Sequence, residues 1–177
     1  MNLYYEDEFV TLFCDDARTV RPDLSQSVVL TGPPYFEHLD SACDVIRALR
    51  APIVICQWNE IQKPPCSLPL VAAHIWINAD AEGMRYQTFY HFDENGVRRR
   101  SAVMQYPTHQ RTHPHDFPVA LAQCLLMKTP TSMPVFDPFM GSGASLIAAK
   151  QLKRKAVGID TDETRLKMAV ERLRETH

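Results

Sequence analysis

The sequence predicts an α/β fold in which helices cover both faces of a mostly parallel sheet. Two observations favour this class. Short apolar runs typical of buried strands alternate along the chain with segments of helical spacing. One such run, 52–56, is apolar throughout, as expected for a strand covered on both faces. With 177 residues, 45% of them hydrophobic, the chain is expected to form a single domain, 1–177, with a sizeable core.

The expected strands are rich in β-branched, aromatic and other apolar residues and stop at turn-forming residues. They span 9–13, 27–31, 52–56, 73–77, 134–136 and 156–159. The segment 86–91, followed by Asn95-Gly96 and then Val97, predicts a β-hairpin, because Asn-Gly suits a type I′ turn.

The expected helices have apolar residues spaced at helical intervals. They span 39–49, 117–127, 142–152 and 163–174. Between the elements, three prolines prevent regular structure at 63–69, and residues 105–116 are expected to form an irregular loop.

Charge and composition narrow the function classes. The formal net charge is −2, so any contact with nucleic acid must come from a local basic patch. Five scattered cysteines without C-x-x-C spacing indicate free thiols in a reducing compartment. We find neither a signal-peptide pattern nor an apolar run long enough to span a membrane, so we expect a cytoplasmic protein.

The most informative segment is a glycine loop that follows the strand 134–136 and precedes a helix. Gly141 and Gly143 let the backbone turn sharply and approach a ligand without a Cβ in the way. About twenty residues later, the next strand ends in Asp160, whose carboxylate is placed to accept hydrogen bonds from both hydroxyls of a ribose. A tight turn without a ligand is the simpler alternative.

The sequence of this loop, Asp-Pro-Phe-Met-Gly-Ser-Gly, resembles motif I of the amino-methyltransferases that use S-adenosylmethionine. It does not resemble the glycine loops of NAD enzymes or of P-loop proteins. The resemblance implies a Rossmann-like methyltransferase fold with a mostly parallel seven-stranded sheet, and S-adenosyl-L-methionine as the cofactor. The cofactor-binding residues implied in this loop are Asp137, Pro138, Phe139, Gly141, Ser142 and Gly143.

A second resemblance lies at the end of strand 27–31, where Gly32-Pro33-Pro34-Tyr35 is similar to motif IV of the same enzymes. That motif reads Asp, Asn or Ser, then Pro-Pro and an aromatic residue. It implies that Tyr35 stacks on an extruded base while the carbonyl of Pro33 accepts a hydrogen bond from the target amine. Thr31 precedes the motif and is expected to contact the cofactor.

Gly32 departs from this pattern, because the side-chain acceptor of the motif is missing. Losing one such contact typically costs about 100–1,000-fold in rate. Another group or a water substitutes, or the enzyme is slow or inactive, or the glycine is an introduced substitution; the sequence does not choose between these.

Two further segments fit the family. The acid Asp15, at the end of strand 9–13, is expected to contact the cofactor's adenine, whereas Asp16 is equally well explained as a helix cap. His113, Phe117 and Pro118 belong to a segment that resembles motif X, which closes over the methionine end of the cofactor. Phe117-Pro118 is closer to the cytosine-N4 members than to the adenine members. His109, His113 and His115 match no standard zinc spacing, so no metal is expected.

The motifs follow a permuted order, with the Pro-Pro-Tyr turn first, the closing loop second and the glycine loop last. This order resembles the β group of DNA amino-methyltransferases, in which the strands 9–13 and 156–159 would be neighbours. The implied function is methylation of adenine N6 or cytosine N4 in DNA. The alternatives are an inactive relative that binds cofactor or DNA as a partner, and an RNA or protein methyltransferase.

Few residues remain for reading a DNA sequence. The loop and hairpin of 59–112 are expected to act as a reduced target-recognition element. The basic residues that could contact phosphates there are Arg98, Arg99, Arg100 and Arg111. A solvated arginine face is the alternative. So small a target-recognition element implies a short or relaxed target sequence, or recognition shared across a homodimer.

Overall fold

The computed structural model describes residues 2–20, 22–34, 39–58, 63–78, 85–106 and 117–176. These residues build a single nine-stranded sheet in the order β1-β2-β9-β8-β3-β4-β6-β5-β7. The strands are β1 (Leu3–Glu6), β2 (Val10–Cys14), β3 (Val28–Thr31), β4 (Ile53–Trp58), β5 (Leu70–Asn78), β6 (Arg85–Asp93), β7 (Val103–Gln105), β8 (Val135–Asp137) and β9 (Ala156–Asp160). The helices are α1 (Leu39–Ala48), α2 (Val119–Leu126), α3 (Ala144–Gln151) and α4 (Glu163–Arg174).

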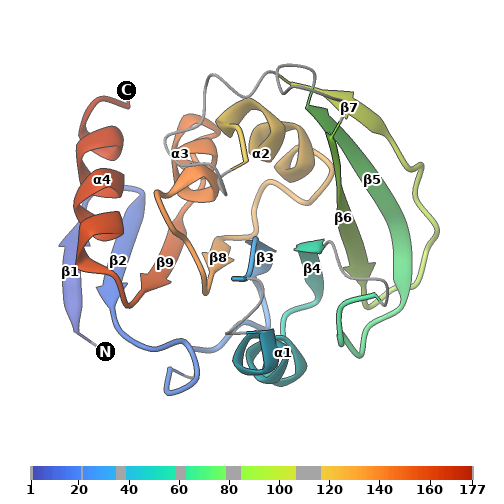
Figure 1. The fold of residues 1–177 in the computed structure, drawn as a ribbon, viewed down its shortest axis with the longest axis horizontal. Helices are drawn as coiled ribbons and strands as arrows, with labels where there is room; N and C mark the ends of the chain where they lie inside the picture. The colour runs from blue at the N-terminus through green and yellow to red at the C-terminus, as the bar shows by residue number, and fades with distance from the viewer. Residues whose placement is uncertain are drawn as a thin grey trace.

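The predicted α/β fold is confirmed, with two more strands than the seven expected. Five neighbouring strands, β2, β9, β8, β3 and β4, run parallel. The additional strands include β1, which pairs antiparallel with β2 at one edge, and β7, which pairs parallel with β5 at the other. The predicted pairing of the first and last expected strands is also confirmed, since Val10 lies opposite Ala156 in the β2–β9 pair. Figure 1 shows β1, β2 and α4 side by side at one end of the molecule.

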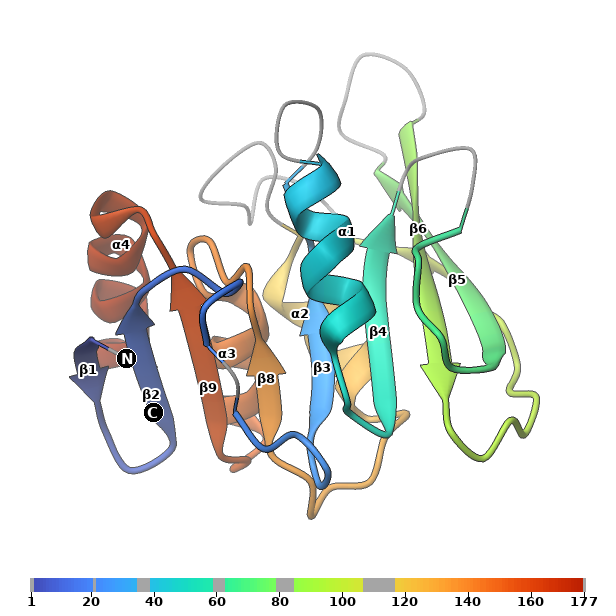
Figure 2. The ribbon, with the colours of Figure 1, turned by 90° about the horizontal axis from the view of Figure 1, so that it is seen from below.

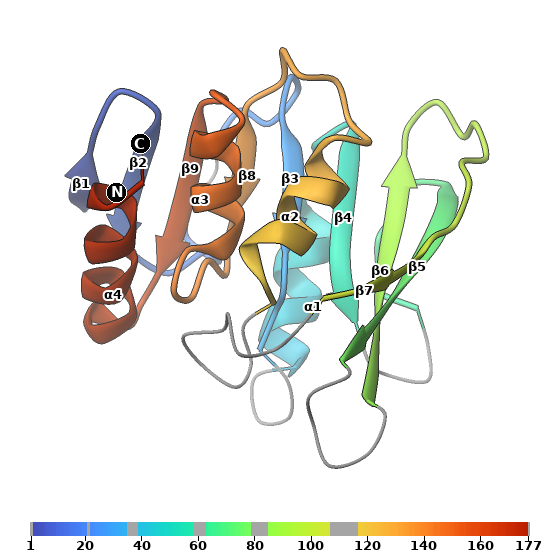
Figure 3. The ribbon, with the colours of Figure 1, turned by 90° about the horizontal axis from the view of Figure 1, so that it is seen from above.

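Helices cover the two faces unequally. Figure 2 shows α1 in front of the sheet, and Figure 3 shows α4, α3 and α2 in front of the opposite face. The three-helix face holds the larger core, where Leu121 and Leu146 pack with side chains of the strands. The α1 face holds a second core around Ile46. No helix of the described segments is both long enough and apolar enough to cross a membrane.

The predicted hairpin at Asn95-Gly96 is wrong. The chain does turn there, but β6 already pairs with β4 on one side and β5 on the other, so no edge remains for the chain after the turn. Only Gly96 has a positive φ, of 64°, whereas a type I′ turn needs one at both central residues. Instead, the Asp93 carboxylate accepts a hydrogen bond from the Asn95 N–H (2.9 Å). After the turn, residues 97–102 lead to β7 without regular structure.

Two histidines lie in the core of the β5–β6 pair. His74 and His91 are fully buried, and their ring centroids are 5.9 Å apart. No hydrogen-bond partner within the described residues reaches any of their four ring nitrogens. Burial lowers the pKa of each ring to about 4, and the nearby cations Arg99 and Lys128 act in the same direction on His91. Both imidazoles are therefore neutral at pH 7.

Candidate active site

A pocket of about 600 Å³ lies where the five parallel strands end. Each strand contributes residues at or just beyond its carboxyl end, the edge at which open α/β sheets bind ligands. The predicted site residues that line it are Asp15, Gly32, Pro33, Pro34, Phe117, Asp137, Pro138, Phe139, Gly141 and Asp160. Residues from opposite ends of the sequence thus meet in one cavity.

The glycine loop is held to the neighbouring strand through its backbone. The Met140 N–H donates to the Ile159 carbonyl (3.1 Å), and the Gly141 N–H donates to Asp160 Oδ2 (2.9 Å). Gly141 has a φ of 52°, in the left-handed region that glycine adopts without strain. Burial raises the pKa of Asp160. The loop and the acid that follows it therefore form one rigid unit at the pocket wall.

Asp137 is buried beneath this loop and acts as its anchor. Its carboxylate accepts hydrogen bonds from the Phe139 N–H (3.0 Å), from Thr31 Oγ1 (2.7 Å) and from Ser145 Oγ. Burial raises the pKa of Asp137 to about 6, although the three donors oppose this rise. Thr31 does not line the pocket; its hydroxyl ties the end of β3 to the end of β8. This bond holds the Pro-Pro turn and the glycine loop at a fixed separation.

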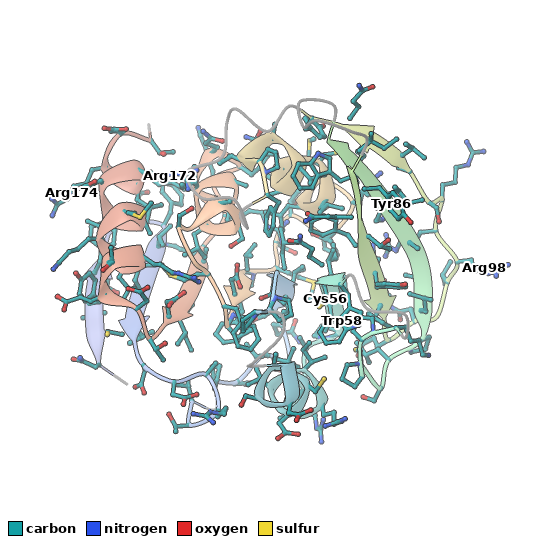
Figure 4. The ribbon with its side chains drawn as sticks, in the orientation of Figure 1. Cys56, Trp58, Tyr86, Arg98, Arg172 and Arg174 are labelled. Carbon is teal, nitrogen blue, oxygen red and sulfur yellow. The ribbon has the colours of Figure 1, made fainter. Side chains whose placement is uncertain are left out.

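Ser142 and Gly143, the last two residues of the glycine loop, do not line the pocket but fix the loop to α4. Arg172, on α4, donates from Nη1 to the Ser142 carbonyl (2.7 Å) and to Ser142 Oγ (2.6 Å). Gly143 has a φ of 82°, and a Cβ there would lie 3.1 Å from the Cβ of Ala169. Figure 4 shows Arg172 on the side of α4 toward α3, whereas Arg174 lies at the outer side. Sequence reasoning missed Arg172, because a helical arginine normally indicates a solvated face.

Asp15 and Asp16 both line the pocket, but they differ in their contacts. Asp15 Oδ1 accepts from the Asp16 N–H (2.9 Å), and this contact is the main reason that the pKa of Asp15 is lowered. Asp16 accepts from the Arg18 N–H (2.8 Å) and forms an ion pair with the Arg18 guanidinium, which lowers the pKa of Asp16. Asp16 therefore stabilises the turn 16–19; a turn and no helix follows it, so its interpretation as a helix cap is not confirmed.

The turn at Gly32 has an unforeseen neighbour. The side chain of Gln57, near the end of β4, reaches the space where a side chain at Gly32 would begin: a Cβ there would lie 2.8 Å from Gln57 Oε1. Gln57 is buried and lines the pocket. The signal in the sequence is a polar residue directly after the apolar run 52–56, a pattern that by itself indicates only the end of a strand.

Tyr35, His113 and Arg111 fall outside the described residues, as do His109 and His115. Pro118 is buried at the start of α2 without lining the pocket.

The arginine run lies apart from the pocket. Arg98 is at the outer edge of the sheet, on the β5 side, far from α4 (Figure 4). Arg99 forms an ion pair with the buried Asp93 (2.6 Å) and donates to the Lys128 carbonyl (3.0 Å), so its guanidinium already has protein partners although its side chain is 37% exposed. Arg98 and Arg100 are exposed and stay candidates for phosphate contact.

Known proteins resemble this chain in sequence over short segments. The Type II methyltransferase M2.LlaDCHI of Lactococcus lactis subsp. cremoris is 40% identical over 62 residues, which are 34% of this chain and 23% of that protein. M2.DpnII of Streptococcus pneumoniae is 39% identical over 62 residues, with the same two shares. The match thus spans under a quarter of the length of either relative.

Solved structures resemble it over almost the whole chain. The PvuII DNA methyltransferase, described as cytosine-N4-specific, has a TM-score of 0.72 at 15% identity, over 93% of this chain and 86% of that one. A protein of Thermus thermophilus described as a DNA modification methylase, solved with S-adenosyl-L-methionine, has a TM-score of 0.71 at 21% identity, over 93% of each chain. At these identities the likeness establishes the fold. The family model described as DNA methylase, of the N6/N4 type, matches residues 57–171, well over half of the sequence, and the chain therefore belongs to that family.

Proposed function

We propose that this chain is an S-adenosylmethionine-dependent enzyme that methylates an exocyclic amino group of a DNA base, adenine N6 or cytosine N4. The observation that carries the proposal is the pocket in which the glycine loop, Asp160 and the turn Gly32–Pro34 meet. The family supports a DNA methylase, and the aligned relatives are named as Type II methyltransferases. With DNA as its substrate, the protein would act in the cytoplasm of a prokaryotic cell, encoded by the cell or by a phage.

The charge of the pocket favours this cofactor over a phosphate-bearing nucleotide. Carboxylates line it at the ends of β2, β8 and β9, through Asp15, Asp137 and Asp160, and Asp16 and Asp162 add to them. Arg18 and Arg165 also line the pocket, so its five carboxylates outnumber its two cations. This excess of negative charge disfavours a pyrophosphate and suits a cofactor with a cationic sulfonium and no phosphate. In this proposal, Asp160 binds the ribose hydroxyls, Asp15 contacts the adenine, and Gly141 allows close backbone approach. When bound, the cofactor supplies an electrophilic methyl group.

The chain's own groups would activate the amine. An exocyclic amine is a weak nucleophile because its lone pair is delocalised into the base ring. The Pro33 carbonyl accepts a hydrogen bond from the amine and draws its nitrogen toward tetrahedral geometry, while Tyr35 stacks on the extruded base. Asp137 and Thr31 act as positioning residues, because their hydrogen bond (2.7 Å) holds the amine side of the pocket against the cofactor side.

Reading of the DNA sequence is assigned to the segment 59–112, with Arg98 and Arg100 as its phosphate contacts. We propose that this reduced recognition element selects a short target, alone or across a homodimer. A salt titration of DNA binding measures the number of phosphate contacts, and the double variant Arg98→Ala/Arg100→Ala should reduce the salt slope by about two. An unchanged slope would show that both arginines are merely solvated.

The proposal is tested by incubating unmodified DNA with the protein and cofactor carrying a tritiated methyl group. Label is expected in DNA and absent from RNA and protein in the same competition. A second candidate, an inactive relative that binds cofactor or DNA, is favoured only by Gly32. Cofactor binding with no label in DNA, even at high protein concentration, would establish that second candidate instead.

A further inference from the structure

We propose that Gln57 replaces the side-chain acceptor that Gly32 lacks, so that its amide oxygen accepts a hydrogen bond from the target amino group. This inference rests on the function proposed above and identifies a catalytic residue for it. A glutamine on the neighbouring strand thus completes the amine-binding turn.

Strand register brings the two residues together. In the parallel β3–β4 pair, Thr31 lies opposite Cys56, so Gly32 and Gln57 follow at the next position of each strand. Gln57 alternates with Ile55 and Ile53, whose side chains pack in the larger core, and it therefore points to the face on which Phe117 lies. A Cβ at Gly32 would contact that same ring, 3.4 Å from Phe117 Cε1.

The amide of Gln57 occupies the space of the missing side chain. A Cβ at Gly32 would lie 2.8 Å from Gln57 Oε1 and 3.7 Å from Gln57 Cδ. The first distance is below any ordinary contact, so a larger residue at position 32 would require the end of the Gln57 side chain to shift. Gly32 shows no positive φ, so its backbone does not require glycine. The lack of a side chain at Gly32 leaves the space that the Gln57 amide occupies.

A second glutamine orients this amide. Gln57 Nε2 donates to Gln87 Oε1 (2.5 Å), so the amide nitrogen is directed to β6 and the oxygen to the Pro-Pro turn. Among the described residues, no donor bonds to Gln57 Oε1. Gln57 is only 1% exposed, yet it lines the pocket. An acceptor that receives no hydrogen bond within the described residues and borders a ligand cavity is suited to a donor on the ligand, here an N–H of the amine.

The chemistry needs an acceptor but no base at this position. The amine nitrogen forms the new N–C bond with its lone pair, and the electrons of the broken S–C bond stay on sulfur, giving S-adenosylhomocysteine. The extra proton on nitrogen then leaves to water, since a neutral amide does not hold it. Two oxygens, from Gln57 and from the Pro33 carbonyl, would accept from the two amine hydrogens. Unlike a carboxylate, the glutamine side chain does not take up a proton in mild acid. Its oxygen can therefore still accept a hydrogen bond from the amine there.

The test moves the side-chain acceptor from position 57, on β4, to position 32, at the end of β3. Gln57→Ala should lower kcat by about 100-fold or more while the cofactor Kd stays within roughly twofold. Gly32→Asp alone should also lower kcat, because the new side chain collides with Gln57. The double variant Gly32→Asp/Gln57→Ala should recover at least about tenfold over Gln57→Ala, and should now lose activity as its carboxylate is protonated in acid.

Matched variants separate catalysis from folding. Gln123→Ala breaks another glutamine pair, Gln123 Nε2 to Gln151 Oε1 (2.8 Å), away from the pocket, and should leave kcat unchanged. Gln57→Glu keeps an oxygen acceptor and should be more active than Gln57→Ala, even if the alanine variant is less stable. A wild-type kcat in Gln57→Ala would overturn this inference and leave the proposed function intact. No methyl transfer by the parent protein would overturn both, and activity appearing only in the double variant would show that Gln57 is no substitute.

Discussion

The buried histidine pair predicts a loss of stability in mild acid whose size follows from the structure. His74 and His91 are neutral in the fold, each with a pKa of about 4, whereas an unfolded histidine has a pKa of 6.5. The unfolded chain therefore binds more protons below pH 6.5, so the free energy of unfolding falls as the pH falls. Between pH 7 and pH 5, each ring should cost about 2 kcal/mol, or about 4 kcal/mol for the pair.

Asp137 opposes part of this loss. Burial raises its pKa to about 6, so the folded protein takes up a proton there between pH 7 and pH 5 while the unfolded chain does not. That uptake should return about 1 kcal/mol. The loss at the two histidines is larger than the gain at Asp137. The free energy of unfolding therefore falls by roughly 2–3 kcal/mol from pH 7 to pH 5.

Urea unfolding at pH 7 and pH 5 measures this difference directly. His91→Leu removes one titrating ring and should make the pH-dependent loss smaller by about 2 kcal/mol, whatever its effect at pH 7. Gln123→Ala leaves both histidines in place, so this variant should lose as much unfolding free energy between pH 7 and pH 5 as the parent protein. If His91→Leu loses as much stability as the parent between the two pH values, the buried rings are not neutral in the fold and the reasoning fails.

Three further predictions concern the glycine loop and the residues that hold it. Asp160→Ala should weaken cofactor binding by about 10–100-fold in calorimetry, because two hydrogen bonds to a charged acceptor are lost; equal affinity would remove Asp160 from the ribose site. Arg172→Met removes both hydrogen bonds to Ser142 and should raise the cofactor Kd by roughly tenfold, and a Kd equal to that of the parent would show that the loop needs no support from α4. Gly143→Ala should cost about 1–2 kcal/mol, from its positive φ and the contact with Ala169. Gly96→Ala, where φ is also positive but the new Cβ meets only ordinary contacts at 3.6 Å, should cost less, so equal losses would refute the steric part of the argument.

The features that the sequence predicts well are governed by local chemistry. The helix 163–174 forms with the predicted bounds, because Asp162 caps it and accepts from the Thr164 N–H (2.8 Å). The strand 27–31 and the glycine loop are likewise marked by residues that stop or permit particular backbone angles. The order of the motifs is enough to predict that the first and last expected strands are neighbours.

The features that it missed depend on contacts between distant strands. Asn95-Gly96 carries a hairpin signal, yet β6 has both edges occupied by β4 and β5, and no local pattern reports that. The sequence leaves several explanations of Gly32 open, and only the pairing of β3 with β4 places Gln57 beside it. Asp137 lines the pocket as the sequence suggests, but its three hydrogen bonds, which anchor the glycine loop, could not be foreseen from local sequence.

The central claim is that this pocket transfers a methyl group to a base amine in DNA. The most direct measurement is digestion of DNA to nucleosides after incubation with the protein and S-adenosylmethionine, followed by mass spectrometry. The account predicts N6-methyladenine or N4-methylcytosine in DNA treated with the parent protein, and a large reduction with Asp160→Ala. Unmodified nucleosides from DNA treated with a parent protein that binds the cofactor would contradict it.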